Sequence, residues 1–248
     1  MIRPLLYPLE NIIMIAIVDC RIPEPSRKRL CELDAELISL PRADYLDTPV
    51  SAHPDMLMFM GWGKLFCHAR YFEKNTALLQ SIAQKCGLDI CLSDEDTGAN
   101  YPRDVLFNCV ILGEHLLCNT KTVSRLILSE AQSRGMNIIH TNQGYTKCSV
   151  CRVSDNAIIT ADISIYTACK EHGIDALLVS ADGVALSGYD CGFIGGATGT
   201  HGECVYFCGD ISLHPDGGKI VEFCKNHGKL AVSLSSEGLY DIGSILFI

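Results

Sequence analysis

Three groups of side chains in the sequence are suited to nucleophilic or acid–base chemistry. Cys148 follows a lysine, and a cysteine thiolate is a strong nucleophile when a nearby cation lowers its pKa. His53 and Asp55 are two residues apart, so on an extended chain both side chains point to the same side. An imidazole beside a carboxylate can transfer protons and hold a cationic substrate. Arg103 and Asp104 add a third charged pair.

Each group also has a structural explanation. His-Pro-Asp is favourable in turns, and an Arg-Asp dipeptide can form a surface ion pair that contributes little. The chain has 14 cysteines, which can pack in the core as small apolar side chains. Cys148-x-x-Cys151 suggests half of a zinc site, but on a strand the two thiols face opposite sides. No second such pair exists, so no metal is expected.

The composition describes a globular protein. Of 248 residues 48% are hydrophobic and 20% charged, which excludes a disordered or fibrous chain. The net charge of −9 disfavours binding to nucleic acid. The chain contains no apolar run of the length, about 18 residues, that predicts a membrane span. The abundant cysteines in a chain of this size predict a reduced, cytoplasmic protein. The sequence contains no cofactor-binding motif. It is compatible with a monomer and with a homo-oligomer.

The elements that would position these residues repeat along the chain. From Met56 the sequence predicts two strands, a helix over Glu73–Cys86 and a third strand. Apolar residues at helical spacing and glycines after the helices support this order. Two strands before each helix do not fit a doubly wound parallel sheet. The order recurs from Val105, Cys148 and Cys204, with helices over 122–134, 164–172 and 218–227.

A fifth copy is divided between the two ends of the chain. Its inner strand is expected at Ile12–Val18, its helix at 26–33, its last strand at 36–40 and the missing outer strand at Ser244–Ile248. We therefore predict one domain over residues 1–248, an α/β propeller of five pseudosymmetric ββαβ units. An ordinary α/β or α+β domain with accidental regularity is the alternative.

Five ββαβ units that close on themselves form the pentein propeller, and the whole chain resembles this fold of guanidino-group-modifying enzymes. These include arginine and agmatine deiminases, dimethylarginine hydrolases and amidinotransferases. A bacterial family of unknown function with this fold is more similar still, through residues 143–153, 157–162, 188–199 and 241–245. The resemblance implies a small cationic guanidino or amidino substrate. A thiolate would attack the guanidinium carbon, an amine would leave, and water would cleave the thiouronium adduct.

The resemblance also implies roles for residues at strand starts. HPDMLMFM (53–60) resembles the His-x-Asp of these enzymes, PRDVLF (102–107) their Arg-Asp pair, and GYTKCS (144–149) the strand start that carries the nucleophile. Cys148 and His53 are thereby implied as catalytic, and Asp55, Arg103 and Asp104 as substrate-binding.

The C-terminus departs from that pattern. The enzymes carry a His and the nucleophilic Cys there, whereas this chain has Leu246 and Phe247. We infer that the site is rotated around the pseudo-axis to Cys148, which places the acid that holds the guanidinium at Glu203. The alternative is a pentein domain without chemistry that binds a small ligand or a protein, as does the ribosome anti-association factor of this fold.

A Gly-rich insert at about 181–202 interrupts the last repeat, and residues 188–202 hold six glycines. It matches no phosphate-binding motif. Long loops of this kind are often lids over functional sites. We predict a lid over the strand starts, in which the backbone amides of Gly195 and Gly196 cradle an anion such as a substrate carboxylate.

Overall fold

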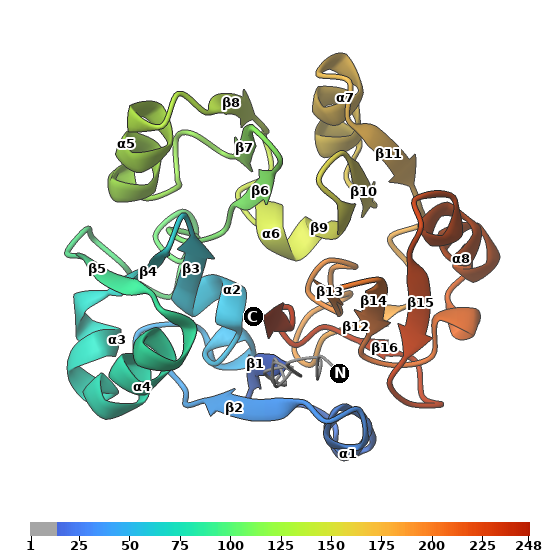
Figure 1. Cartoon of the computed structure of the whole chain (residues 1–248), viewed down its shortest axis with the longest axis horizontal. Helices are drawn as coiled ribbons and strands as arrows, with labels where there is room; N and C mark the ends of the chain where they lie inside the picture. The colour runs from blue at the N-terminus through green and yellow to red at the C-terminus, as the bar shows by residue number, and fades with distance from the viewer. Residues whose placement is uncertain (1–13) are drawn as a thin grey trace, which may run out of the picture.

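The computed structural model describes residues 14–248, which form a mixed α/β fold of several small sheets (Figure 1). Within this range there are five three-stranded sheets and one two-stranded sheet, and none closes on itself. The sheets lie around a common centre, with α1, α4, α5, α7 and α8 on the outside (Figure 1).

One three-stranded sheet shows the plan of all five. Strands β3 (Met58–Gly61) and β4 (Lys64–His68) form an antiparallel hairpin. Helices α3 (Ala69–Lys74) and α4 (Thr76–Cys86) then carry the chain to β5 (Asp89–Ser93), which is parallel to β4. A parallel pair needs such a crossover, whereas a hairpin needs only a short turn.

Three further segments follow the same order, and each has an antiparallel and a parallel pair. Their elements are β6 (Val110–Leu112), β7 (His115–Cys118), α5 (Arg125–Ser133) and β8 (Asn137–His140); β9 (Val150–Ser154), β10 (Ala157–Thr160), α7 (Ile163–Glu171) and β11 (Asp175–Leu178); and β13 (Thr198–His201), β14 (Cys204–Phe207), α8 (Gly217–Asn226) and β15 (Leu230–Ser233).

The fifth sheet joins the two ends of the chain. Strand β17 (Leu246–Phe247) pairs antiparallel with β1 (Ile15–Asp19), and after α1 (Glu24–Glu32) the strand β2 (Glu36–Leu40) pairs parallel with β1. The C-terminal strand therefore completes the first segment, but at the inner edge, where it contacts β13, rather than at the outer edge that the sequence suggested. Residues 12 and 13 of the expected strand lie outside the described residues.

Short elements stand between these segments, except for one 3₁₀ helix that lies within the last of them, between β14 and α8. Two of them, α2 and α6, lie near the centre, directly before β3 and β9 (Figure 1). The short elements are η1 (Thr48–Val50), α2 (Pro54–Leu57), α6 (Thr146–Ser149), β12 (Val184–Ala185), η2 (Ile211–Leu213) and β16 (Leu239–Tyr240).

The fourth hairpin differs from the sequence expectation. The segment from Cys204, expected as the first strand of its unit, is the middle strand β14, and the first strand β13 comes from the Gly-rich insert. The expected second strand is the 3₁₀ helix η2. Strand β13 reads Thr-Gly-Thr-His, so it has no hydrophobic periodicity. Contacts with β9 and β17 hold it in place.

Candidate functional site

His53 lies in a buried position between two carboxylates. It precedes α2, whose first residue is a proline, as is favourable at a helix start. Its Nε2 is 3.9 Å from Oδ2 of Asp19, and its Nδ1 is 3.8 Å from Oδ1 of Asp241. The expected extended chain from His53 to Asp55 is therefore replaced by a helical turn, and the two side chains reach different partners.

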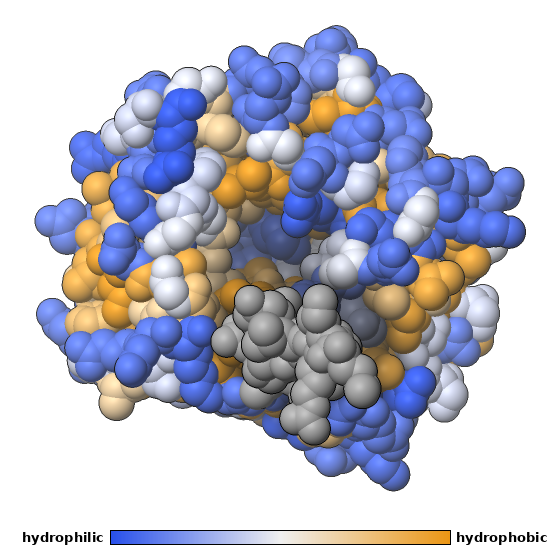
Figure 2. Space-filling view, viewed as in Figure 1, coloured by the Kyte–Doolittle hydropathy of each residue, from blue (hydrophilic) through white to orange (hydrophobic). Residues whose placement is uncertain are grey.

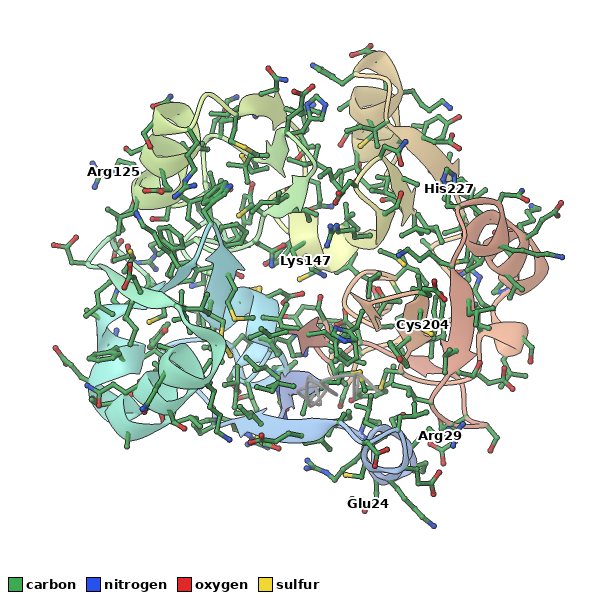
Figure 3. The ribbon with its side chains drawn as sticks, in the orientation of Figure 1. Glu24, Arg29, Arg125, Lys147, Cys204 and His227 are labelled. Carbon is green, nitrogen blue, oxygen red and sulfur yellow. The ribbon has the colours of Figure 1, made fainter. Side chains whose placement is uncertain are left out.

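Asp55 belongs to a chain of polar contacts that reaches the C-terminal segment. Its Oδ2 accepts a hydrogen bond from Oγ of Ser244 at 2.7 Å, and that hydroxyl accepts one from Nζ of Lys147, also at 2.7 Å. The buried Oδ1 of Asp55 makes no hydrogen bond with any residue in 14–248. Figure 3 shows Lys147 near the centre of the molecule. The contacts tie α2, α6 and the segment before β17 together.

Cys148 lies in α6 and is buried. The side-chain amide of Asn108 donates to its sulfur at 3.1 Å, while Oδ1 of Asn108 accepts from the backbone N–H of Cys148 at 3.1 Å. Burial, followed by the negative charges of Asp55 and Asp241, raises the pKa of the Cys148 thiol well above its ordinary value. The thiol is therefore protonated at neutral pH unless a cation offsets these charges.

The acidic side chains at this end of the sheets form the most unusual feature of the core. Among residues 14–248 the only buried carboxylates are those of Asp19, Asp55, Asp104 and Asp241, with exposures of 2, 1, 4 and 1%. Asp19 ends β1, beside the start of its antiparallel partner β17, and the other three precede β3, β6 and β17. Buried charges are costly unless they are paired, so this acidic cluster favours a cation.

Only part of the negative charge is balanced by the protein. Nη2 of Arg21 lies 2.6 Å from Oδ2 of Asp19, and Nε donates to Oδ1 at 2.9 Å. Asp241 accepts backbone hydrogen bonds from Phe193 and Gly243 at 2.8 and 2.9 Å. Burial nevertheless raises the pKa of Asp241 above its usual range, against the lowering effect of His53.

Asp104 is held by an aromatic hydroxyl. Tyr145 donates to its Oδ2 at 2.7 Å, while Oδ1 has no hydrogen-bond partner within the described range. Burial raises the pKa of Asp104. The neighbouring Arg103 instead lies at the surface, 3.4 Å from the exposed Asp96. Asp104 is therefore buried in the interior, whereas Arg103 forms an ion pair at the surface.

Glu203 does not join the cluster. The sequence placed it at a strand start, whereas the structure places it on the exposed turn between β13 and β14. The turn is at the opposite end of β13, because the true strand start is at Thr198. The rotated frame inferred from the repeat therefore misplaced Glu203 by one strand.

The Gly195–Gly196 pair packs against the strand starts and does not present a free anion cradle. The N–H of Gly196 donates to the carbonyl of Cys148 at 2.7 Å, and its carbonyl accepts from the N–H of Ser244 at 2.7 Å. A Cβ on Gly196 would overlap with Oδ1 of Asp241. These glycines are needed for close approach of the backbones, and the Gly196 amide is already used.

The rest of the insert lies beside the candidate site. The hydroxyl of Tyr189 donates to Oδ2 of Asp47 at 2.9 Å, and the ring of Phe193 stacks on Tyr145 at a centroid distance of 5.9 Å. Leu186 and Phe193 pack in the same core cluster as Cys148. These contacts are compatible with the expected lid.

Two cavities approach the acidic cluster. One of about 370 Å³ is lined by Asp19, Arg21, Arg42, His53 and Asp241. The second, of about 350 Å³, reaches Asp55 and Lys147. Figure 2 shows a hollow near the centre of this face of the molecule. Cys148 lines neither cavity, so a ligand must move the surrounding segments to reach it.

Three residues of the site, Asn108, Asp19 and Asp241, were not predicted from the sequence. Asn108 stands two residues before β6, as Cys148 stands two before β9, so aligning the repeats would have found it. Asp19 and Asp241 are acidic residues next to apolar strand segments, a weaker signal.

Within residues 14–248 there is no group of three or more His, Cys, Asp or Glu side chains arranged to hold a metal ion. In the same range no helix is long and apolar enough to cross a membrane.

The model of one protein family, described as a family of unknown function (DUF6873), matches residues 17–246. The chain belongs to this family. No curated protein sequence matches this chain. The family assignment confirms the expectation from the four sequence segments and leaves the activity open.

Solved structures similar to this DUF6873 chain are pentein-fold enzymes. DDAH from Pseudomonas aeruginosa in complex with citrulline has a TM-score of 0.59 at 10% identity, over 90% of this chain and 91% of that one. An agmatine deiminase from C. jejuni has a TM-score of 0.53 at 8% identity, over 90 and 87%. An amidinotransferase of saxitoxin biosynthesis from Microseira wollei has 0.52 at 10%, over 85 and 75%. At these identities the similarity shows the fold.

Proposed function

We propose that this chain is a cytoplasmic pentein enzyme, a hydrolase or transferase of a small guanidino or amidino cation with Cys148 as nucleophile. In this proposal the five three-stranded sheets are the five units of a pseudosymmetric propeller. The observation that carries the proposal is the acidic cluster, because three of the four buried carboxylates of the described chain, those of Asp19, Asp55 and Asp241, lie around His53 and Cys148. A guanidinium ion offers the planar donors that carboxylates pair with most strongly.

The charge of the substrate would activate the nucleophile. Burial, followed by the charges of Asp55 and Asp241, raises the pKa of Cys148, so a bound cation that offsets these two charges removes their part of the shift and favours the thiolate. The thiolate then attacks the guanidinium carbon and forms a carbon–sulfur bond. The chemistry is thereby restricted to cationic substrates.

His53 would serve as base and acid in turn. It takes the proton of the Cys148 thiol, gives it to the departing amine as the carbon–nitrogen bond breaks, and then takes one from the water that attacks the thiouronium carbon. Cleavage of the carbon–sulfur bond returns the thiolate. Asp19 and Asp241, at 3.9 and 3.8 Å from the two ring nitrogens, would orient the imidazole through this cycle. In a transferase an acceptor amine takes the place of water.

Asp55 and Asp104 would bind the substrate in this scheme. Each has a buried carboxylate oxygen without a hydrogen bond in the described structure, and a cationic donor would satisfy it. Arg103, paired at the surface, and Glu203, on its distant turn, receive no role.

A binding protein without catalysis is the second candidate. It is favoured by the burial of Cys148 and the raised pKa of its thiol, and by Leu246 and Phe247 in the C-terminal strand. In this case the acidic cluster holds a cation that is never transformed.

The test combines binding and turnover with arginine, methylated arginines, agmatine and shorter guanidino acids. Calorimetry reports binding, and release of ammonia or alkylamine reports turnover. The proposal expects release by the wild type and by Cys151→Ser, a neighbouring buried thiol, and no release by Cys148→Ser. Binding by the wild type without release would favour the second candidate. Absence of binding to every cation tested would contradict both.

A further inference from the structure

The cavity that reaches Asp55 and Lys147 has a character different from the acidic cluster. It has a volume of about 350 Å³, within the usual range for small-molecule sites. Its wall comes largely from apolar side chains, among them Phe59, Phe107, Ile111 and Phe247, together with residues of the β3–β4 turn. The cavity therefore lies along the first strands of the sheets, β3, β6, β13 and β17. From the candidate catalytic residues it extends toward the turns of the hairpins.

The wall contains a cation that the protein does not fully use. Nε of Arg152 is buried and makes no hydrogen bond with any residue in 14–248. The guanidinium of Arg152 pairs with Asp155 three residues later, but the two side chains are 42 and 71% exposed, so this pair contributes little. An Arg side chain with a free buried donor is suited to a carboxylate.

At the inner end, the other two charged lining groups, Lys147 and Asp55, have opposite signs. Lys147 reaches Asp55 through the hydroxyl of Ser244, at 2.7 Å on each side. Arg152 is thus the lining charge left without a buried partner. A ligand with one negative charge and an apolar body would satisfy the free donor and cover the aromatic wall.

We propose that this cavity, which touches the acidic cluster only at Asp55, is a second ligand site, for a small apolar carboxylate. The carboxylate pairs with Arg152, and the aliphatic or aromatic body packs against Phe59, Phe107, Ile111 and Phe247. Burial of such a body removes apolar surface of both ligand and wall from water. This site does not depend on the proposed function, because none of its apolar residues takes part in the chemistry.

The test uses three probes of the same shape, 4-phenylbutyrate, 4-phenylbutan-1-ol and 4-phenylbutylamine, with binding measured by calorimetry on the full chain. The proposal expects the carboxylate to bind at least about tenfold more tightly than the alcohol or the amine, since a charge-assisted hydrogen bond is at stake. Arg152→Gln should remove this preference, and Arg152→Lys should keep part of it. Arg29→Gln is the matched control, because Arg29 also forms an ion pair with an acidic residue three positions later and lies at the periphery (Figure 3).

Several results would overturn the proposal. Equal binding of the carboxylate and the alcohol would show that no anion is recognised, and preference for the amine would show that Asp55 dominates the cavity. A carboxylate preference unchanged in Arg152→Gln would place the site elsewhere, as would no binding of any probe. The measurement is repeated in Cys148→Ser, which removes the proposed nucleophile and in which carboxylate binding should persist, so failure here is separable from failure of the proposed function.

Discussion

The side-chain amide of Asn108 donates a hydrogen bond to the sulfur of Cys148 at 3.1 Å. The same amide donates to the backbone carbonyl of Asp55 at 3.2 Å. One buried Asn thus connects the segments before β3, β6 and β9. It also fixes the position of the thiol relative to Asp55, since its Oδ1 holds the backbone N–H groups of Lys147 and Cys148.

Replacement of this amide should destabilise the fold. Asn108→Ala leaves the N–H groups of Lys147 and Cys148 without their acceptor in a buried site, and we expect a loss of about 2–4 kcal/mol in the free energy of unfolding. Urea denaturation monitored by circular dichroism measures it. Asn142→Ala, at an exposed position, should change stability by less than about 0.5 kcal/mol. Equal effects of the two variants would show that the Asn108 contacts contribute nothing.

The buried carboxylate of Asp104 should make stability fall as pH rises. Its pKa is raised in the folded state, so between the unfolded pKa, about 3.9, and the higher folded pKa the native state binds more protons. Stability is then lost progressively as pH rises through this window. Asp104→Asn, which cannot ionise, should gain stability relative to the wild type at pH 7, with the difference shrinking toward pH 4.

Thermal unfolding from pH 4 to 8 checks the Asp104 prediction. Asp96→Asn is the control, because Asp96 is largely exposed beside Arg103. An Asp104→Asn difference that is the same at pH 4 and pH 7 would contradict the assigned cause.

Removal of the C-terminal strand should weaken the whole fold. Ile15 and Ile248 exchange backbone hydrogen bonds at 3.1 and 3.0 Å, and Phe247 is paired with Ala16. Deletion of Leu246–Ile248 exposes β1 and β13, and we expect at least about 3 kcal/mol of lost stability. Leu230→Ala, at a side chain 64% exposed, serves as the control in the same urea titration. A deletion variant with the midpoint and slope of the wild type would refute closure of the fifth sheet.

The position of Glu203 makes a simple contrast with that of Asp55. Binding of butylguanidinium, measured by calorimetry, should weaken at least about tenfold in Asp55→Asn, because a charge-assisted pair is lost. It should change less than about twofold in Glu203→Gln, since that carboxylate is exposed on the β13–β14 turn. Comparable losses in both variants would return Glu203 to the binding site.

The helices and most strands were predictable because they are amphipathic or strongly apolar. Helix α4, for example, ends at Cys86, and the following Gly87 has a φ of 62°, a conformation that glycine adopts without strain. Strand β13 was not predictable from hydrophobicity, because its Thr-Gly-Thr-His sequence is buried by neighbouring strands rather than by its own apolar side chains. Tertiary contacts decide such a strand.

The positions of the candidate site residues were likewise predictable from local sequence in some cases and dependent on tertiary contacts in others. The structure places His53, Asp55, Asp104 and Cys148 at buried positions before strands, as the sequence suggested. Their roles stay a prediction. The position predicted for Glu203 was wrong because the first strand of its unit is β13 and not the segment from Cys204. The pairing of His53 with Asp19 and Asp241 depends on contacts between distant segments, which spacing along the chain cannot reveal.

The central claim is that a bound cation activates Cys148. Its most direct measurement compares alkylation by cationic 2-chloroacetamidine and neutral 2-chloroacetamide at pH 7.5, with peptide mapping of every cysteine. The exposed Cys20 and Cys191 are internal references. We expect chloroacetamide to label these two before Cys148, whose thiol is buried with a raised pKa, and chloroacetamidine to label Cys148 first. Labelling of Cys20 or Cys191 ahead of Cys148 by both reagents would contradict the account.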